Sequence, residues 1–550
     1  MTIELPENTR AEALAHGFLS GRLSRRQLLR GSALFGGAAL AATTLGPLLA
    51  ACGASTPSTT SAGSGAAAAG TPVRGGSLNV ALTGNPTTMD PATAGVYTSL
   101  QVLDNIFNKL ITMDEAGKFV PDLASAWKQN DPLTYTFDLV SNATFHNGEK
   151  FTAADVKYTF ERIANPKTAS SYASAYTSIK TIEVKSSTQV IFHLKTPFAP
   201  LLTNLAQNGE IVNQKAVESS DSARNPVGTG PFMFVEWIQG DHVTLKKNPN
   251  YFVSGKPFLD QVNFKFLAVD QSRIAALQSG QLDWIDAIPL NQLTALKKNS
   301  SYTYATSAQA GIPDFLAMNT SRAPFNSKAL REAVAAAVDR KEILDIAYFG
   351  AGEPGYMEVP SGSKWYGGTP PNQSGPDLTL AKQKMVEAGY PDGLTVTYLS
   401  LPQYPELQKT GVVLRDQLKK IGITVELQQL EVTVWFGRYA KSDYQMTSAY
   451  WSGTIDPDNF YSTQLQTGAA NNATKYSNPA VDALITKARA ATDDSTRKTM
   501  YDQIRRIIWA DAPIIFLHYE TINYLMRSQV HGSVVNPPLE LGLANVWKSS

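Results

Sequence analysis

From Ser77 onward, the apolar positions of the chain follow two alternating periods. Residues 133–139 carry Leu, Tyr, Phe and Leu at every second position, with Thr, Thr and Asp between them, which predicts a half-buried strand. Immediately afterwards, Thr152 and Asp155 match a helix capping box, and apolar residues follow at helical spacing, namely Val156, Phe160 and Ile163. The stretch 133–163 therefore predicts a strand, a turn and a helix.

Residues that typically cap helix ends predict further helices. Ser327 can cap a helix whose buried face is Leu330, Val334 and Val338. A helix over 378–388 ends at Gly389, and one over 406–421 ends at Gly422. An alternating strand follows, with its apolar positions at Ile423, Val425 and Leu427. Because strands and helices are mixed throughout, we expect an α/β architecture.

The N-terminal region reads as an export signal. Arg25 and Arg26 precede an uncharged stretch, 31–51, which is long enough to span a bilayer but is diluted by Gly, Thr, Ser and Pro. A basic region followed by such a stretch is typical of a secretory signal. The paired arginines resemble the twin-arginine signal, and Leu-Ala-Ala-Cys-Gly around Cys52 resembles the bacterial lipobox, whose cysteine becomes the lipid-bearing N-terminus. We predict a signal peptide over 1–51 and lipidation at Cys52.

The amino-acid composition excludes several classes of function. The 550 residues include 48 Lys+Arg and 47 Asp+Glu, and no run of basic residues marks a nucleic-acid surface. One cysteine excludes an intrachain disulfide and a cysteine-based metal site. Residues 52–75 are dominated by Ala, Ser, Thr, Gly and Pro, so we expect a flexible linker. Nucleic acid is not an expected partner.

Signs of catalysis are weak. The sequence has no phosphate-binding loop, no Gly-x-Ser-x-Gly elbow and no His-Glu-x-x-His helix. The glycine-rich run 228–231 ends in proline and reads as a tight turn. The histidines lack the i, i+3 or i+4 spacing of a helix-borne metal pair, and His193 reads as an ordinary strand residue. The acid pairs Asp283/Asp286 and Asp456/Asp458 follow no spacing rule. We expect no enzyme activity, cofactor or metal, and an exported hydrolase stays a remote alternative.

Several blocks of sequence lie one after another along Leu78 to Arg527, and they include Leu123–Trp127, Leu133–Phe137, Phe145–Glu149, Phe151–Val156, Phe160–Arg162, Pro226–Phe232, Asn248–Tyr251, Gly255–Pro257 and Ala276–Asp283. In content and order these blocks resemble family 5 of the extracellular solute-binding proteins, the receptors of peptide-type ABC importers. The resemblance implies a two-lobed periplasmic-binding-protein-like α/β fold, type II and cluster C-like, with an extra third domain.

Carried onto this sequence, the resemblance implies a lobe I over 76–115, 226–305 and 523–550, with the extra domain 116–225 inserted in it. Lobe II would be 306–522. It also implies a monomeric receptor that closes on a peptide or another small polar solute and presents it to an ABC permease. A lipid on Cys52 would hold the receptor at the outer face of the cytoplasmic membrane.

The expected ligand contacts come from the same resemblance. In peptide-binding relatives an aspartate three residues after a tryptophan meets the ligand's amino group, but here Trp451 is followed by Thr454. Asp456 looks like the family's structural Asp-Pro and is a weaker candidate. The loop 401–409 lacks the arginine that dipeptide receptors use for the carboxylate. The remaining candidate contacts are Tyr97, Tyr404, Trp451, Ser452, Gly453 and Thr454.

Two ligand classes stay open on these residues. Longer peptides can be held through their backbone, with the charged ends near solvent. Alternatively, an oligosaccharide or other polar solute would suit neutral donors and flat rings, and the second lobe offers Trp365, Tyr366, Tyr404, Trp435 and Trp451. Of these, we expect Trp435 to be a core residue.

Overall fold

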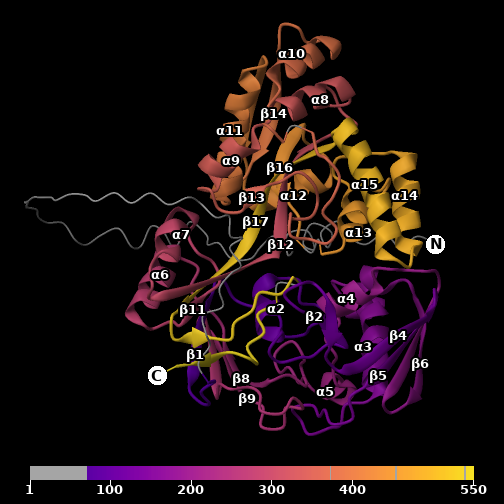
Figure 1. The fold of residues 1–550 in the computed structure, drawn as a ribbon, viewed down its shortest axis with the longest axis vertical. Helices are drawn as coiled ribbons and strands as arrows, with labels where there is room; N and C mark the ends of the chain where they lie inside the picture. The colour runs from indigo at the N-terminus through magenta and orange to yellow at the C-terminus, as the bar shows by residue number, and fades with distance from the viewer. Residues whose placement is uncertain (1–70, 372, 453–454, 538–539, 550) are drawn as a thin grey trace, which may run out of the picture.

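The structure is a computed structural model that describes residues 71–371, 373–452, 455–537 and 540–549. Two lobes lie one above the other in Figure 1 and are joined by two long strands. The predicted signal peptide, with Arg25 and Arg26, and the predicted lipid site at Cys52 lie outside the described residues. So do Gly453 and Thr454.

A long mixed sheet runs through both lobes. Across the sheet the strands are β15 (Ile423–Gln429), β14 (Leu394–Ser400), β16 (Met446–Tyr450), β12 (Tyr302–Met318), β17 (Ile514–Arg527), β11 (Trp284–Ile285), β1 (Ser77–Leu82), β10 (Gln261–Phe266), β9 (His242–Lys247) and β8 (Phe232–Ile238). The short strand β13 (Glu353–Pro354) also pairs with β17. The upper lobe holds β13 to β16, and the lower lobe holds β1 and β8 to β11 (Figure 1).

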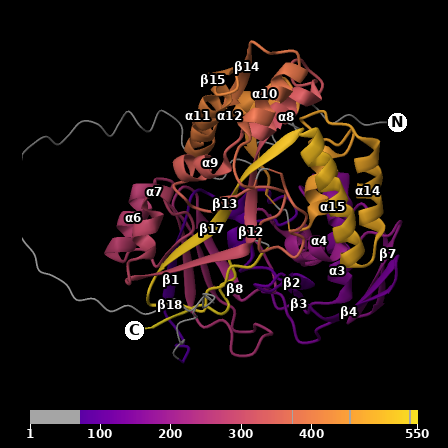
Figure 2. The same cartoon turned by 45° about the horizontal axis from the view of Figure 1, so that its top comes forward.

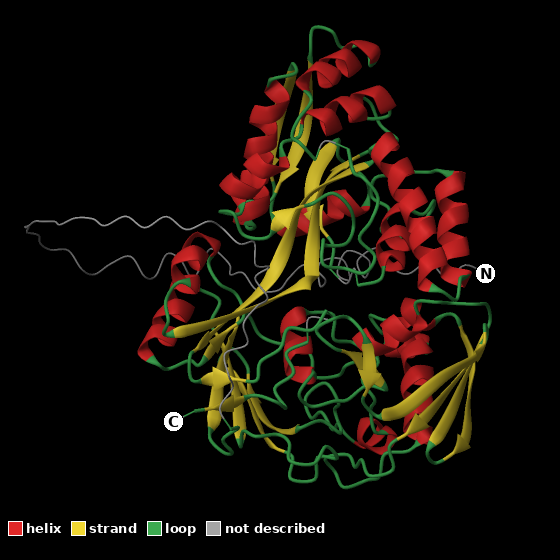
Figure 3. Cartoon of the chain, in the orientation of Figure 1, coloured by secondary structure: helices red, strands yellow, loops and turns green. Residues whose placement is uncertain are grey.

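Two antiparallel strands form the connection between the lobes. At its upper end β12 pairs with β16, and at its lower end β17 pairs with β11. Between these ends, 305–312 of β12 and 519–524 of β17 pair with each other, with β13 as the one added neighbour among the described strands. We call these two segments the ribbon junction, which Figure 3 shows as the yellow strands crossing the centre of the molecule.

Helices cover both sides of the upper part of the sheet. They are α8 (Lys328–Ala337), α9 (Arg340–Ala347), α10 (Leu378–Glu387), α11 (Pro405–Lys419), α12 (Val432–Ala440), α13 (Pro457–Phe460), α14 (Pro479–Ala490) and α15 (Asp494–Asp511). One apolar core includes Phe315, Trp435 and Phe516, and a second core across the sheet includes Leu316, Val396 and Leu517. Consecutive residues of β12 thus enter opposite cores, as strand geometry requires.

The lower lobe adds a separate antiparallel sheet. Its strands lie in the order β4 (Ala124–Asp131), β5 (Thr134–Leu139), β7 (Gln189–Leu194) and β6 (Ile179–Ser186), and we call the region built on them the small-sheet domain. These strands fall within the predicted inserted domain 116–225. The other lower-lobe elements are α2 (Tyr97–Leu103), β2 (Ile111–Met113), β3 (Phe119–Pro121), α3 (Ala153–Ala164), α4 (Leu201–Asn208), α5 (Gln214–Ser219), α6 (Asp270–Ser279), α7 (Leu290–Lys297), β18 (Val530–His531) and β19 (Trp547–Lys548).

The small-sheet domain also touches the upper lobe. The N–H of Ala199 donates to the carbonyl of Arg489 in α14 at 2.8 Å, and the Arg489 guanidinium lies 5.7 Å from the Phe198 ring centroid. Ile455 of the upper lobe packs against the apolar core of the small-sheet domain. We call this contact the side junction; α4, next to it, lies below α14 and α15 in Figures 1 and 2.

Locally predicted features are confirmed. The Asp155 carboxylate accepts from the N–H of Thr152 at 2.9 Å, and α3 begins at the next residue. Ser327 caps α8 through the N–H of Leu330. Gly389 and Gly422, each with a φ near 90°, follow α10 and α11. The strand predicted from residue 133 begins one residue later, and Leu133 itself is 39% exposed.

The glycines of the run 228–231, which was predicted to form a tight turn, are required for a more specific structural reason. A Cβ on Gly228 would lie 2.0 Å from the carbonyl oxygen of Ile106, and one on Gly230 would lie 2.5 Å from its carbonyl carbon. Such contacts are too short for any side chain, so both glycines allow two backbone segments to pack directly. The N–H of Gly230 donates to Ile106 across this contact at 2.8 Å.

Candidate functional site

Strand β16 carries the first candidate residues to the ribbon junction. Tyr450, its last residue, pairs with Asp314 of β12. One residue further, the N–H of Trp451 donates to the carbonyl of Pro313 at 3.2 Å, so the pairing continues toward Ser452. Ser452 is exposed. The strand therefore presents Ser452 beside the ribbon junction.

The side chain of Trp451 is held by its own lobe. Its Nε1 donates to Oδ1 of Asn459 in α13 at 2.8 Å, and its ring packs against the upper-lobe core. The residue is nevertheless only partly buried. An indole fixed on one side and open on the other can offer a flat apolar surface without losing much freedom on binding.

Tyr404 lies against Tyr450. It is the residue before α11, and its ring meets the Tyr450 ring edge to face, with centroids 6.2 Å apart. Burial, followed by the nearby Tyr404, Glu520 and Asp314 groups, raises the pKa of Tyr450 well above its usual range. The Tyr450 phenol is thus neutral at physiological pH. The structure brings Tyr404 together with the end of β16.

Tyr97 belongs to the other lobe. It is the first residue of α2 and is half-buried, and its hydroxyl lies 3.0 Å from the Tyr524 hydroxyl of β17. Burial is the main cause that raises the pKa of Tyr97 well above its usual range. The hydrogen bond between the two phenols ties α2 to the lower end of the ribbon junction.

Asp456 occupies a different kind of position. Both of its oxygens accept from Arg497 in α15, at 2.7 and 2.8 Å, and one also accepts from the N–H of Asp458 at 3.0 Å. Asp456 and Arg497 are both about 3% exposed. This geometry fits the structural interpretation of Asp456 better than a ligand contact. The loop 451–456 is consequently attached to α13 at both ends, by Trp451 and by Asp456.

A buried polar group that no sequence pattern predicted lies at the top of the ribbon junction. His518 lies 3.0 Å from Asp314 through Nδ1 and 2.7 Å from the Ala351 carbonyl through Nε2. Its ring stacks on Tyr348, with centroids 3.6 Å apart. The signal that could have revealed this cluster is a charged residue, Asp314, directly before the apolar run 315–318.

Other polar candidates have structural partners. Asp283 accepts from the N–H of Asn79 and pairs with Lys548 at 2.9 Å, and Asp458 pairs with Arg489 at 2.7 Å. His193 lies on the surface beside Glu183. Trp435 is fully buried, as predicted. Across the described ranges, no group of three His, Cys, Asp or Glu residues is placed to hold a metal ion.

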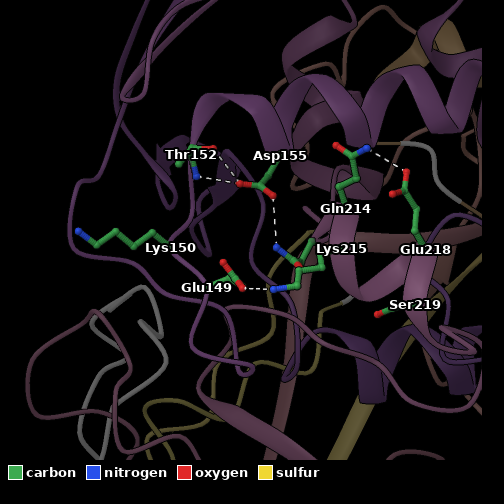
Figure 4. Close-up of a pocket in the computed structure, with 9 residues that line it drawn as sticks. Glu149, Lys150, Thr152, Asp155, Gln214, Lys215, Glu218 and Ser219 are labelled. Atoms are coloured by element: carbon green, nitrogen blue, oxygen red, sulfur yellow. Dashed lines mark hydrogen bonds and ion pairs between the residues drawn. The ribbon is translucent and has the colours of Figure 1, made fainter.

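A hollow of about 470 Å³ lies on the small-sheet domain, away from these candidates. Figure 4 shows that several of its polar side chains interact with one another, whereas Lys150 and Ser219 are joined to none of the residues drawn. Lys215 pairs with Glu149 at 2.6 Å, and Gln214 donates to Glu218 at 2.9 Å. Asp155 there belongs to the cap of α3. These polar groups are therefore engaged with one another or in a helix cap.

A family model and the sequence of a related protein both match most of this chain. A family model described as "Bacterial extracellular solute-binding proteins, family 5 Middle" matches residues 118–472. The "Probable D,D-dipeptide-binding periplasmic protein DdpA" of Escherichia coli K12 is 31% identical over 475 residues, which cover 83% of this chain and 91% of that protein.

No helix in the part of the chain that the structure describes is long and apolar enough to cross a membrane.

Solved structures agree in fold. The periplasmic binding protein DppA of Helicobacter pylori, in complex with the peptide STSA, is 27% identical with a TM-score of 0.74, over 87% of this chain and 99% of that one. The binding protein AgaA from A. tumefaciens R10, in complex with agropinic acid, is 29% identical with a TM-score of 0.73, over 86% and 99%. The two-lobed α/β fold expected from the sequence is confirmed.

Proposed function

The chain belongs to family 5 of the bacterial extracellular solute-binding proteins, and on that premise we propose that it captures peptides outside the cytoplasm and delivers them to the permease of an ABC importer. The family places the chain among solute-binding transport proteins. The peptide assignment is supported chiefly by the likeness, over most of the chain, to a relative named for dipeptide binding and to a structure containing a peptide.

In the proposed mechanism the ligand lies between the lobes, beside the ribbon junction. Tyr97 would contact it from the lower lobe, and the upper lobe would contribute Tyr404, Trp451, Ser452, Gly453 and Thr454. Asp456 would hold the loop that carries Trp451, Ser452, Gly453 and Thr454. A bound ligand favours the closed arrangement only through contacts that the open one lacks. Lobes joined by two strands can close in this way without breaking the chain.

The proposed location is the outer face of the cytoplasmic membrane. Export through the twin-arginine signal, lipid on Cys52 and the linker 52–75 would tether a monomeric receptor within reach of its permease. A lipidated N-terminus with two or more acyl chains gives stable anchoring. The lipid is tested by labelling cells with a clickable fatty acid: Cys52→Ser should abolish the label.

A second candidate keeps the receptor role but changes the ligand. The described upper-lobe candidates Tyr404, Trp451 and Ser452 are uncharged, and such a set also suits an oligosaccharide or another polar solute. The likeness to a protein solved with agropinic acid gives this candidate separate support. The two candidates differ in the ligand that occupies the protein when it is isolated.

Native mass spectrometry separates the candidates. The full-length gene is expressed in cells grown on rich medium, and the protein is purified from membranes in detergent without added ligand. We expect a series of bound masses at amino-acid spacing. A hexose-spaced series would favour the second candidate, and hydrolysis of the bound species during storage would revive the exported hydrolase.

A further inference from the structure

The residues that precede β1 are fixed to the loop between β9 and β10. The N–H of Gly75 donates to the carbonyl of Phe258 at 2.9 Å, and the N–H of Gly76 donates to the Asp260 carboxylate at 3.2 Å. Strands β1, β10 and β9 are neighbours in the long sheet and lie in the lower part of the lower lobe (Figure 1). The segment that leads toward Cys52 therefore joins the fold at this corner of the sheet.

Four cations surround this corner, and we call Arg74, Lys246, Lys247 and Lys256 the basic corner. Lys246 and Lys247 are the last residues of β9, and the N–H of Lys247 donates to the backbone of the β9–β10 loop at 2.8 Å. Arg74 and Lys256 share one aromatic ring. The guanidinium carbon of Arg74 lies 5.6 Å from the Phe258 ring centroid, and Nζ of Lys256 lies 3.9 Å from it. The first and last segments of this corner thus carry their charges side by side.

The positive charge of the basic corner is not balanced within the fold. Among the described residues, none of its four cations lies within 4.0 Å of a carboxylate. Burial and the neighbouring Arg74 charge lower the pKa of Lys256, as expected where two like charges are held together. The loop 248–260 contains a single acid, Asp260, whose carboxylate accepts from Gly76. The basic corner therefore carries an excess of positive charge, which an anion from outside the chain can neutralise.

Exposed apolar side chains border these cations. Val73, directly before Arg74, is 43% exposed, and Val253 is 41% exposed. The turn that carries Val253 is closed by the N–H of Lys256, which donates to the Val253 carbonyl at 3.2 Å. Cations next to exposed apolar side chains suit the surface of a bilayer, where phosphate groups lie beside the boundary of the acyl chains.

We propose that the basic corner binds the phosphate headgroups of anionic phospholipids, so that the lower lobe rests on the membrane where the linker joins it. The inference goes beyond ligand capture and rests on the proposed membrane tether. The sequence predicts a flexible linker over 52–75, and a flexible chain of that length spans about 25 Å. A protein on such a tether meets the bilayer at a high effective concentration, so an attraction of about fivefold for each cation suffices.

The test varies only the charge of the bilayer. The full chain, purified from membranes in detergent, is reconstituted into vesicles of phosphatidylcholine alone or of an equal mixture with phosphatidylglycerol. Lysines are acetylated with a reagent that does not cross membranes, and mass spectrometry gives the rate for each lysine. We expect phosphatidylglycerol to slow the acetylation of Lys246 and Lys256 at least about threefold. Lys382 of α10, which is exposed in the upper lobe, should react equally fast in both vesicles.

Salt provides a second measurement on the same samples. In about 1 M salt the screening length falls to about 3 Å, so the slowing of Lys246 and Lys256 should disappear. Slowing that persists in such salt would contradict an attraction between charges.

Matched double variants separate the basic corner from the general surface charge. Arg74→Gln with Lys246→Gln removes two of the four cations and should reduce the slowing of Lys256 to less than about 1.5-fold. Lys382→Gln with Lys441→Gln removes two exposed cations from the upper lobe and should keep the full slowing. Thermal melting checks that both variants are folded, and Lys246→Gln alone, with an intermediate effect, replaces the first pair if that pair unfolds.

Each outcome decides between the claims. Equal rates in both vesicles, or slowing of Lys256 that survives Arg74→Gln with Lys246→Gln, would overturn the membrane contact while ligand capture stands. Equal slowing by inorganic phosphate added to phosphatidylcholine vesicles would reveal a site for free anions and would also overturn the contact. Protein that floats with neither kind of vesicle on a density gradient would overturn the proposed tether, and the membrane contact with it.

Discussion

Two junctions hold the same two lobes together, and they differ in strength. The ribbon junction consists of two continuous strands joined by backbone hydrogen bonds. The side junction consists of one backbone hydrogen bond, the contact of Arg489 with Phe198, and the packing of Ile455. The first cannot separate without unfolding the sheet, whereas the second can open at modest cost. We infer that the ribbon junction acts as the hinge and the side junction as the contact that opens and closes.

The largest expected effect comes from the buried pair behind the side junction. Asp456→Ala leaves Arg497 buried without its partner, which costs about 3–5 kcal/mol of the free energy of unfolding. Chemical denaturation followed by circular dichroism measures this loss. Asp494→Ala, at an exposed acid 4.0 Å from the same arginine, should change the free energy by less than about 0.5 kcal/mol. Similar losses in both variants would contradict this account.

The next effect concerns the lower end of the ribbon junction and depends on pH. Burial raises the pKa of Asp286 from 3.8 to about 6, against the opposing influence of Arg273 and a hydrogen bond from Gln101. The folded state thus holds this proton more tightly than the unfolded state, so its stabilising effect is complete below pH 3.8 and is lost as the pH rises through about 6.

Asp286→Asn removes that penalty. Near pH 7.5 the variant should be more stable than the wild type by about 1–3 kcal/mol, with the difference shrinking toward pH 4. Thermal melts across this pH range measure it. A difference that does not vary with pH would show that Asp286 is not the titrating group.

A smaller effect is expected at the loop that links the two junctions. Trp451→Ala removes the partly exposed indole and its bond to Asn459. Ligand affinity should fall about tenfold, while the melting temperature changes little, because Asp456 still holds the loop. Isothermal titration with the ligand found by mass spectrometry measures the change. Unchanged affinity would remove Trp451 from the site.

The smallest effect tests the side junction itself. Phe198→Ala removes the ring beneath Arg489 and should weaken ligand affinity by about threefold to fivefold, because closure loses a contact of about 1 kcal/mol. X-ray scattering should show a larger radius of gyration for the unliganded variant. Val184→Ala, at a position in β6 that is 42% exposed, is the control and should change neither quantity.

Local features of the fold were predictable from the sequence. The capping box at Thr152 and the helix ends before Gly389 and Gly422 depend on residues within a few positions of one another. The pairing of β12 with β17 could not be predicted from the sequence. It joins segments that begin 212 residues apart, and the apolar periodicity of a strand does not show which distant strand it pairs with or in what register.

For the candidate site, the sequence allowed a hypothesis for only some of the residues. Resemblance pointed to Tyr404 and to Trp451 at the end of β16, which the structure places on one side of the upper lobe. Asp314 and His518 escaped notice because their proximity arises from that distant pairing.

The position of β17 also sets the order in which the chain can fold during synthesis. All four strands of the small-sheet domain lie within residues 124–194, so that sheet is complete early in translation. The long sheet has at its centre a strand that spans residues 514–527, so the edges of β12 and β11 that pair with it stay open until β17 has been synthesised. Unpaired strand edges are sites of aggregation. A chain released by a ribosome that stalls before residue 514 would therefore be prone to aggregate. Its small-sheet domain could fold, but the long sheet that runs through both lobes would lack β17.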